Sequence, residues 1–281
     1  MSPLLRVEDL RVTTSTGRTL LDGVSWSVDA GDRLGIVGES GSGKSMSALA
    51  VLGLLPEGMR ATGRVLLDGT DLLALPPRRL SAVRGAQVAM VFQEPLTALD
   101  PLMTVGRQIT GPLRLHRGLR GAAARDEAAR LARLVQLDDT ERILRSYPWQ
   151  LSGGQRQRVA LATALACEPR VLLADEPTTA LDVTVQAEVL DLLDDLVDRT
   201  GVALVLVTHD LPVLARVARD LVVMRDGRVV ERTTVAAALA GGEAAYTRQL
   251  VGAARAVTGL PAPGLPASGL PASARVEGDA R

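Results

Sequence analysis

The chain has 281 residues, a formal net charge of zero and one cysteine. The length allows one large α/β domain with a subdomain or two small domains. The balanced charge gives no global attraction to nucleic acid or to an anionic membrane. Because Cys167 is alone, an internal disulfide is excluded, and a reducing compartment is expected. No apolar run approaches the roughly 18 residues that cross a bilayer, and the first residues lack the pattern of a secretion signal, so we expect a soluble cytoplasmic chain.

The N-terminal segments have the alternating pattern of β-strands. Residues 4–12 and 20–28 alternate between apolar and polar side chains, and a turn is predicted between them at 13–18. We expect these segments to form an antiparallel β piece with Trp26 in its core. Residues 65–69 predict a further strand that ends in a turn.

A glycine-rich turn joins the apolar run 34–37 to the helical segment 46–52. Strand, turn and helix in this order are typical of a phosphate-binding loop, because the glycines let peptide N–H groups converge on an anion at the positive end of the helix. Lys44 is the only lysine in the chain, and its compact ammonium suits the β- and γ-phosphates better than a guanidinium. The predicted nucleotide-binding residues are Gly38, Glu39, Ser40, Gly41, Ser42, Gly43, Lys44, Ser45 and Met46, and the Ser45 hydroxyl is the predicted ligand of Mg²⁺.

The apolar strand predicted at 88–92 places Gln93 at its carboxyl end, where ligands of open α/β sheets bind. Gln93 is therefore a candidate contact for Mg²⁺ or the attacking water, although a glutamine in this position is by itself often only a strand end. From 105 to 146, alanine, leucine and arginine recur at helical spacing, which predicts a helical subdomain over about residues 94–160. His116 within it is expected to be a solvated surface residue.

Residues 151–155 read Leu-Ser-Gly-Gly-Gln and precede a helical segment. Ser152 is a natural N-cap, and the two glycines expose the amides at the start of the helix. This helix start is a second potential anion-binding site, although the same residues on their own would favour an ordinary capped helix.

Two further apolar strands are predicted to end in polar residues. Residues 171–174 lead into Asp175 and Glu176, and residues 202–207 lead towards His209. One acid after a strand can hold Mg²⁺, and its neighbour can polarise a water aimed at a γ-phosphate. A structural histidine is the usual explanation for His209 alone, but polar residues at several strand ends favour one shared site.

The remaining segments complete the predicted domain. A helix is expected over 180–199, and residues 221–224 and 227–230 predict a hairpin that closes the sheet. Residues 258–281 repeat a Gly-Leu-Pro-Ala pattern and are expected to form a disordered tail rich in proline, glycine, alanine and serine, with no catalytic role.

The motifs together resemble those of the ATP-binding cassette (ABC) ATPases over about residues 4–250. They occur in family order: the phosphate loop, the Q-loop residue Gln93, the signature at 151–155, the Walker B pair Asp175 and Glu176, the D-loop residue Asp182 and the switch residue His209. The sequence segments at 92–101, 147–148, 175–184 and 246–250 resemble those of the peptide and nickel importer subfamily. The resemblance implies an α/β fold over residues 1–257, in which a P-loop NTPase core of the ABC type, a mixed sheet flanked by helices, carries an antiparallel β subdomain and a helical subdomain.

The resemblance also implies an ATPase that uses ATP and Mg²⁺. Glu176 would be the general base, His209 would contact the γ-phosphate, and Gln93 would assist them. Mg²⁺ would be held by Ser45, Gln93 and Asp175. Two subunits would face head to tail, so that each contributes to the other's nucleotide site the residues Ser152, Gly153, Gly154, Gln155 and Asp182.

The partners implied by the resemblance are those of an importer for peptides or nickel. They are the transmembrane permease subunits, a second ABC ATPase subunit that is either identical or homologous, and indirectly an extracytoplasmic solute-binding protein. The chain would lie peripherally at the cytoplasmic face of the membrane, where the segment after Gln93 would bear against the permease. No nucleic acid partner is expected.

The chain departs from the family pattern in two places. Residues 12–15 lack the aromatic residue that usually stacks on adenine, so adenine selectivity is loose or the partner subunit supplies the contact. No cysteine cluster follows the domain, which excludes the iron–sulfur centre of some relatives.

The main alternative is a soluble ABC ATPase that acts on DNA or ribosomes. The single cassette and the compact stretch between Gln93 and Leu151 argue against it. A catalytically inactive binding module is disfavoured by the intact Glu176 and His209, and a kinase or GTPase would have no use for the signature.

Overall fold

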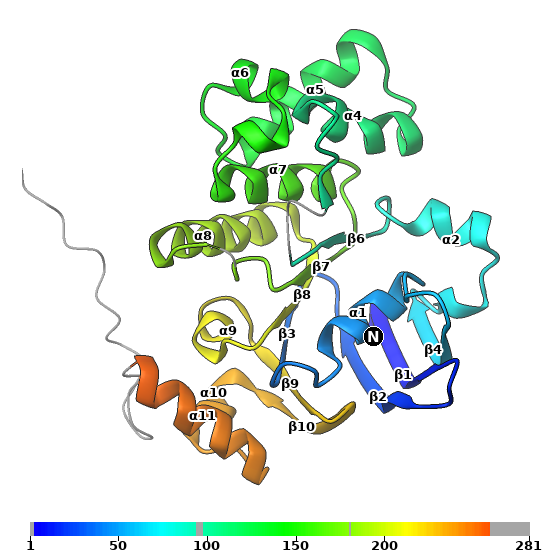
Figure 1. Ribbon diagram of the computed structural model, residues 1–281, viewed down its shortest axis with the longest axis vertical. Coiled ribbons are helices and arrows are strands. Elements are labelled where there is room, and N and C mark those ends of the chain that lie inside the picture. The colour runs from blue at the N-terminus through cyan, green and yellow to red at the C-terminus, as the bar shows by residue number, and fades with distance from the viewer. Residues whose placement is uncertain (1–2, 94–97, 180, 259–281) are drawn as a thin grey trace, which may run out of the picture.

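The computed structural model describes residues 3–93, 98–179 and 181–258. One of its two sheets is antiparallel, with strand order β2-β1-β4-β5, and lies at the lower right of Figure 1. Its strands are β1 (Leu5–Thr14), β2 (Thr19–Val28), β4 (Met59–Leu67) and β5 (Thr70–Asp71). The expected antiparallel piece is confirmed, and Trp26 is only 3% exposed. The predicted turn is shorter than expected, because β1 continues through Thr14.

The second sheet has six strands in the order β10-β9-β3-β8-β7-β6. They are β3 (Arg33–Val37), β6 (Val88–Val91), β7 (Val171–Asp175), β8 (Ala203–Thr208), β9 (Asp220–Arg225) and β10 (Arg228–Thr234). All neighbouring pairs are parallel except β9 and β10, which form the predicted hairpin. The sheet is therefore mixed, and the carboxyl ends of its parallel strands meet at one edge.

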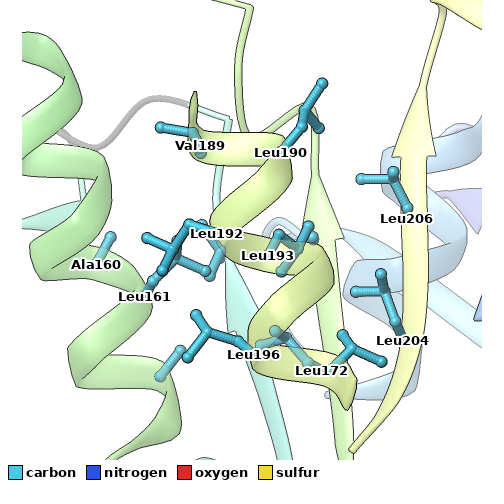
Figure 2. Packing of buried hydrophobic residues seen from close by; sticks show 14 of the residues in the cluster. Ala160, Leu161, Leu172, Val189, Leu190, Leu192, Leu193, Leu196, Leu204 and Leu206 are labelled. Atoms are coloured by element: carbon cyan, nitrogen blue, oxygen red, sulfur yellow. The ribbon is translucent and has the colours of Figure 1, made fainter. Parts of the chain in front are cut away.

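The central strands are buried on both faces, which explains their continuous apolar sequences. Adjacent residues of a strand point to opposite faces, so Leu204 and Leu206 of β8 belong to one core, whereas Val205 and Val207 belong to the other. The first core is formed with helices such as α8 (Val183–Thr200), whose leucines pack between the sheet and a neighbouring helix in Figure 2. The second core lies between the six-stranded sheet, α1 (Lys44–Val51) and the antiparallel sheet.

Among the described residues between β6 and β7, four helices gather at the top of Figure 1, away from the antiparallel sheet. They are α4 (Val105–His116), α5 (Gly121–Leu134), α6 (Thr140–Arg145) and α7 (Gly153–Leu165). The helical character predicted for 105–146 is confirmed, and His116 is partly buried at the end of α4. The division at 94 and 160 stays a prediction, since residues 94–97 lie outside the described part of the chain and α7 continues to Leu165.

Several elements were not expected from the sequence. They are α2 (Pro77–Val83), α9 (Leu211–Val217), α10 (Val235–Ala240), α11 (Ala245–Thr258) and the single 3₁₀ turns at Leu72–Ala74 and Pro148–Gln150. The tail predicted at 258–281 lies, apart from its first residue, outside the described residues. Among the described helices, none combines the length and the apolar content needed to cross a membrane.

A buried carboxylate on β10 anchors the start of α11. Glu231 is 9% exposed and accepts hydrogen bonds from the backbone N–H groups of Glu243 (2.9 Å) and Ala244 (2.8 Å) and from the hydroxyl of Thr247. Burial pushes the pKa of Glu231 upward, but these hydrogen bonds outweigh it, so the net pKa lies below the ordinary value. The ionised carboxylate therefore fixes α11 against the sheet.

Glu231→Gln is expected to lower the free energy of unfolding by about 2 kcal/mol at neutral pH, because hydrogen bonds to a charged acceptor are lost. Since the folded-state pKa of Glu231 is depressed, its stabilisation is complete above the unfolded-state pKa and is lost as pH falls through the folded-state value. The difference between the two proteins should shrink below about pH 4. Urea denaturation over this pH range measures it, with the neighbouring exposed Glu243→Gln as control. Equal stabilities at pH 7 would contradict the anchoring role.

Candidate functional site

The phosphate loop connects β3 to α1 and depends on glycine at both ends. A Cβ atom on Gly38 would lie 2.1 Å from the carbonyl oxygen of Met224, which no side chain can accommodate. Gly43 has a backbone φ of 97°, and a Cβ there would lie 2.3 Å from the Leu21 side chain. The loop is therefore packed directly against β9 and β2, with the N-terminus of α1 pointing into it.

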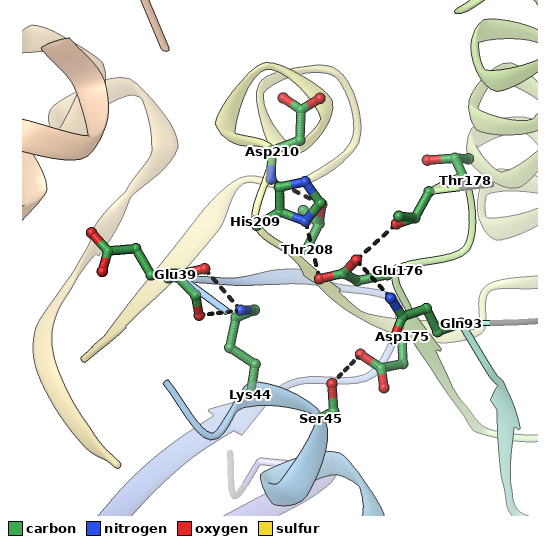
Figure 3. Close-up of polar contacts among 12 residues, drawn as sticks. Glu39, Lys44, Ser45, Gln93, Asp175, Glu176, Thr178, Thr208, His209 and Asp210 are labelled. Carbon is green, nitrogen blue, oxygen red and sulfur yellow. Dashed lines mark hydrogen bonds and ion pairs between the residues drawn. The ribbon is translucent and has the colours of Figure 1, made fainter. Parts of the chain in front are cut away.

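Lys44 is 5% exposed and lies along the inside of the loop. Its Nζ donates hydrogen bonds to the carbonyl oxygens of Gly38 (2.8 Å) and Glu39 (2.9 Å), as Figure 3 shows. Burial lowers the pKa of Lys44, although the nearby charges of Glu176 and Asp175 act in the opposite direction. An ammonium group has three N–H donors, so one remains for a phosphate oxygen.

Asp175 ends β7 beside the phosphate loop. It is 5% exposed, and its carboxylate accepts a hydrogen bond of 2.9 Å from the Ser45 hydroxyl. Burial raises the pKa of Asp175, and the hydrogen bond from Ser45 only partly offsets this effect. A buried carboxylate beside a hydroxyl is an oxygen donor set that suits Mg²⁺.

The described residues contain no group of three His, Cys, Asp or Glu side chains that could hold a metal ion by themselves. An ion at Ser45 and Asp175 would therefore complete its coordination with phosphate oxygens and water. Mg²⁺ is commonly bound in this way, by one or two protein groups together with phosphates. The residues present thus fit the predicted ion.

Glu176 follows Asp175 in an unusual backbone conformation. Its φ is 44°, in the left-handed region that non-glycine residues seldom occupy, and its N–H donates to the carbonyl oxygen of Val207 at 2.8 Å. Strain of this kind costs energy and persists where neighbouring contacts hold it. Here it turns the Glu176 side chain into the same pocket as the phosphate loop.

Three donors surround the Glu176 carboxylate. His209 Nδ1 lies 3.0 Å from one oxygen, and Gln93 Nε2 lies 3.3 Å from the other (Figure 3). Thr179 Oγ1 lies 2.8 Å from the same oxygen as Gln93. Partial burial pushes the pKa of Glu176 upward, but the hydrogen bonds from His209 and Thr179 and nearby positive charge outweigh it, so its pKa is lowered. The carboxylate is thus ionised at neutral pH. It can accept a proton when one of these three hydrogen-bond donors is displaced from it.

The structure brings the predicted residues from three strand ends to one cavity of about 680 Å³. Gln93, Glu176 and His209 line it together with the phosphate loop and Met46. It is also lined by residues that were not predicted from the sequence, namely Leu20, Thr179 and Leu250. Thr179 could have been suspected from its place three residues after Glu176, whereas no local pattern marks the two leucines.

The geometry of this site is compatible with several classes of phosphate-loop protein, and comparison with known families distinguishes among them. Residues 21–179 match the family model described as ABC transporter. The chain belongs to the ABC transporter family. The α/β fold predicted for an ABC cassette, with its mixed sheet and separate antiparallel sheet, is confirmed.

Related proteins and structures agree with this assignment. The oligopeptide transport ATP-binding protein OppD of Salmonella typhimurium is 45% identical over 231 residues, which cover 81% of this chain and 69% of OppD. The peptidoglycan transport ATP-binding protein YejF of Agrobacterium fabrum is 46% identical over 256 residues, 89% of this chain, but the chain spans only 47% of YejF. A dimeric, post-hydrolysis structure of the ATP-binding cassette MJ0796 bound to ADP and Pi has a TM-score of 0.72 at 32% identity and covers 82% of this chain and 98% of that chain.

The signature of this ABC cassette lies apart from its own phosphate loop. Ser152 caps α7 by accepting a hydrogen bond from the Gln155 N–H (3.2 Å), and the Gln155 side chain bonds back to the Ser152 N–H (3.0 Å). Neither residue lines the cavity around Lys44, nor does Asp182, which caps α8 through the Val185 N–H (3.0 Å). A single chain therefore does not unite all the predicted nucleotide-binding residues.

Proposed function

We propose that the chain is the ATP-hydrolysing subunit of an ABC importer for peptides. The observation that carries this proposal is the convergence of the phosphate loop, Asp175, Glu176, Gln93 and His209 at one edge of the sheet. Relatives named for peptide or oligopeptide transport favour peptides over nickel as the solute, since they match at 41 to 48% identity over most of the chain.

In this proposal, ATP binds with its phosphates along the loop, where the amides and Lys44 neutralise charge that develops on the γ-phosphate. Glu176 accepts a proton from the attacking water, and Gln93 and His209 hold that water and the γ-phosphate in place. The side chains of Ser45, Asp175 and Gln93 would hold Mg²⁺, which supplies positive charge to the phosphate oxygens.

A second cassette would complete the site. Ser152, Gly153, Gly154 and Gln155 at the start of α7 would face the γ-phosphate of a partner chain at the positive end of this helix, and Asp182 would couple the two sites. ATP would hold the two subunits together because it contacts both, and hydrolysis would release them. The dimeric MJ0796 cassette supports this pairing by analogy.

The helical region offers exposed apolar side chains for a membrane partner. Leu102 is 85% exposed and Trp149 is 65% exposed, and the Trp149 ring stacks on Tyr147 with centroids 6.0 Å apart. Exposed aromatic residues often anchor protein interfaces. We propose that this surface contacts the permease at the cytoplasmic face of the membrane, together with residues 94–97, which lie outside the described residues. A solute-binding protein outside the membrane would act through the permease.

Reconstitution with the permease tests the proposal. The full chain is co-expressed with its membrane subunits, placed in liposomes with internal ATP, and assayed for uptake of labelled oligopeptides and of Ni²⁺ in the presence of the binding protein. We expect ATP-dependent peptide uptake. ATP hydrolysis that proceeds without any membrane subunit and responds instead to DNA or ribosomes would favour the soluble alternative.

A further inference from the structure

The cavity around the phosphate loop has an apolar lining that the family motifs do not explain. Apart from glycines, its apolar lining residues are Leu20, Met46 and Leu250. Leu20 and Leu250 are both partly exposed and lie outside the segment that matches the family model, residues 21–179. None of the residues that line the cavity is Phe, Tyr or Trp.

Leu250 reaches the cavity because α11 is tied to the phosphate loop. The backbone N–H of Glu39 donates a hydrogen bond of 3.0 Å to the phenol oxygen of Tyr246, which is 5% exposed. The guanidinium of Arg225 covers the Tyr246 ring, 4.8 Å from its centroid. Residues four apart lie on the same face of a helix, so Leu250 lies on the face of α11 that Tyr246 directs at the loop.

Leu20, near the N-terminus, is held in place by the β9–β10 turn at Gly227. The β9–β10 turn joins β2 to the loop, because the Gly227 N–H donates to the Ser42 carbonyl (3.1 Å) and the Asp22 N–H donates to the Gly227 carbonyl (2.9 Å). A Cβ on Gly227 would lie only 2.2 Å from the Leu20 carbonyl oxygen, so the backbone at Leu20 is packed tightly against this turn. The side chain of Leu20 is thus held beside the phosphate loop.

We propose that Leu20 and Leu250 form an aliphatic platform for the base of the bound nucleotide, in place of the missing aromatic residue at 12–15. This inference rests on the proposed binding of ATP and adds α11 to the nucleotide site. A purine has two apolar faces, and contact with leucine side chains removes apolar area from water without requiring an aromatic partner. Lys44 and the loop amides bind the phosphates, so the leucines affect only ligands that carry a base.

The test compares ATP with inorganic tripolyphosphate, which has the same phosphate chain and no base. Calorimetry with the full-length protein measures both affinities for the wild type, Leu250→Ala, Leu20→Ala and the volume-conserving Leu250→Met. We expect each alanine variant to weaken ATP binding about fivefold, because roughly half of a leucine side chain's contact is lost. Tripolyphosphate affinity should change less than about twofold, and Leu250→Met should bind ATP like the wild type.

The controls are Gln249→Ala, an exposed neighbour on α11, and Thr19→Ala, an exposed neighbour on β2. Melting temperatures confirm that the variants are folded, and Leu20→Ala carries the test on a separate element if truncation on α11 lowers stability. Equal losses for ATP and tripolyphosphate, or no loss for either, would overturn the platform. A wild-type protein that binds neither ligand would instead remove the proposed ATPase function itself.

Discussion

Glu176→Gln is expected to slow ATP hydrolysis by a factor on the order of 10² to 10⁴ while ATP stays bound. The amide cannot take a proton from water, but it keeps the size of the carboxylate and can still accept a hydrogen bond from Thr179 or His209. Because the bound nucleotide is not consumed, the variant should accumulate as a closed dimer, with itself or with a homologous subunit. Steady-state ATPase assays and light scattering of the ATP-bound protein measure the two effects.

The matched control is Glu57→Gln, an exposed glutamate outside the cavity. It should leave both the hydrolysis rate and the mass of the ATP-bound species unchanged. Wild-type turnover by Glu176→Gln would show that another group accepts the proton. A slow variant that remains strictly monomeric with ATP would preserve the assignment of Glu176 but would contradict the composite site.

Lys44→Ala is expected to weaken ATP binding by a factor on the order of 10², because charge-assisted hydrogen bonds to the phosphates are lost. The same change removes the donor to the carbonyl oxygens of Gly38 and Glu39, so the loop loses internal support as well. Titration calorimetry with ATP measures the affinity, and circular dichroism checks that the fold is retained.

Lys44→Arg separates charge from shape. The guanidinium keeps the positive charge but is too broad to occupy a 5% exposed position between two carbonyl groups without displacing the loop. We expect its ATP affinity to fall between those of the wild type and Lys44→Ala. An affinity unchanged in Lys44→Ala would show that the phosphates lie elsewhere.

The sequence predicted those parts of the fold that are determined by residues close together in the chain. Continuous apolar runs followed by polar residues gave the strands that end at Gln93, Asp175 and His209, because both faces of a central strand are buried and ligands bind at the carboxyl edge. The phosphate loop and the N-cap at Ser152 could also be predicted from the sequence, because the backbone geometry of each depends on only a few neighbouring residues.

The contacts between distant segments could not be predicted in this way. The order of strands in the sheet places β9 beside β3, and nothing in either segment specifies that neighbour. The hydrogen bond from Glu39 to Tyr246 spans 207 residues, and the position of Leu250 follows from it. Glu176 in a left-handed conformation was also unexpected, because glutamate has no intrinsic preference for it.

The bond between Glu39 and Tyr246 has a consequence for how the protein is made. The ribosome synthesises the phosphate loop early, but the helix that braces it emerges 207 residues later. A nascent chain can therefore form β3 and α1 without yet having a complete nucleotide pocket, since both Tyr246 and Leu250 are still to come. The pocket with its Tyr246 brace and its Leu250 lining thus becomes complete only after translation has passed α11.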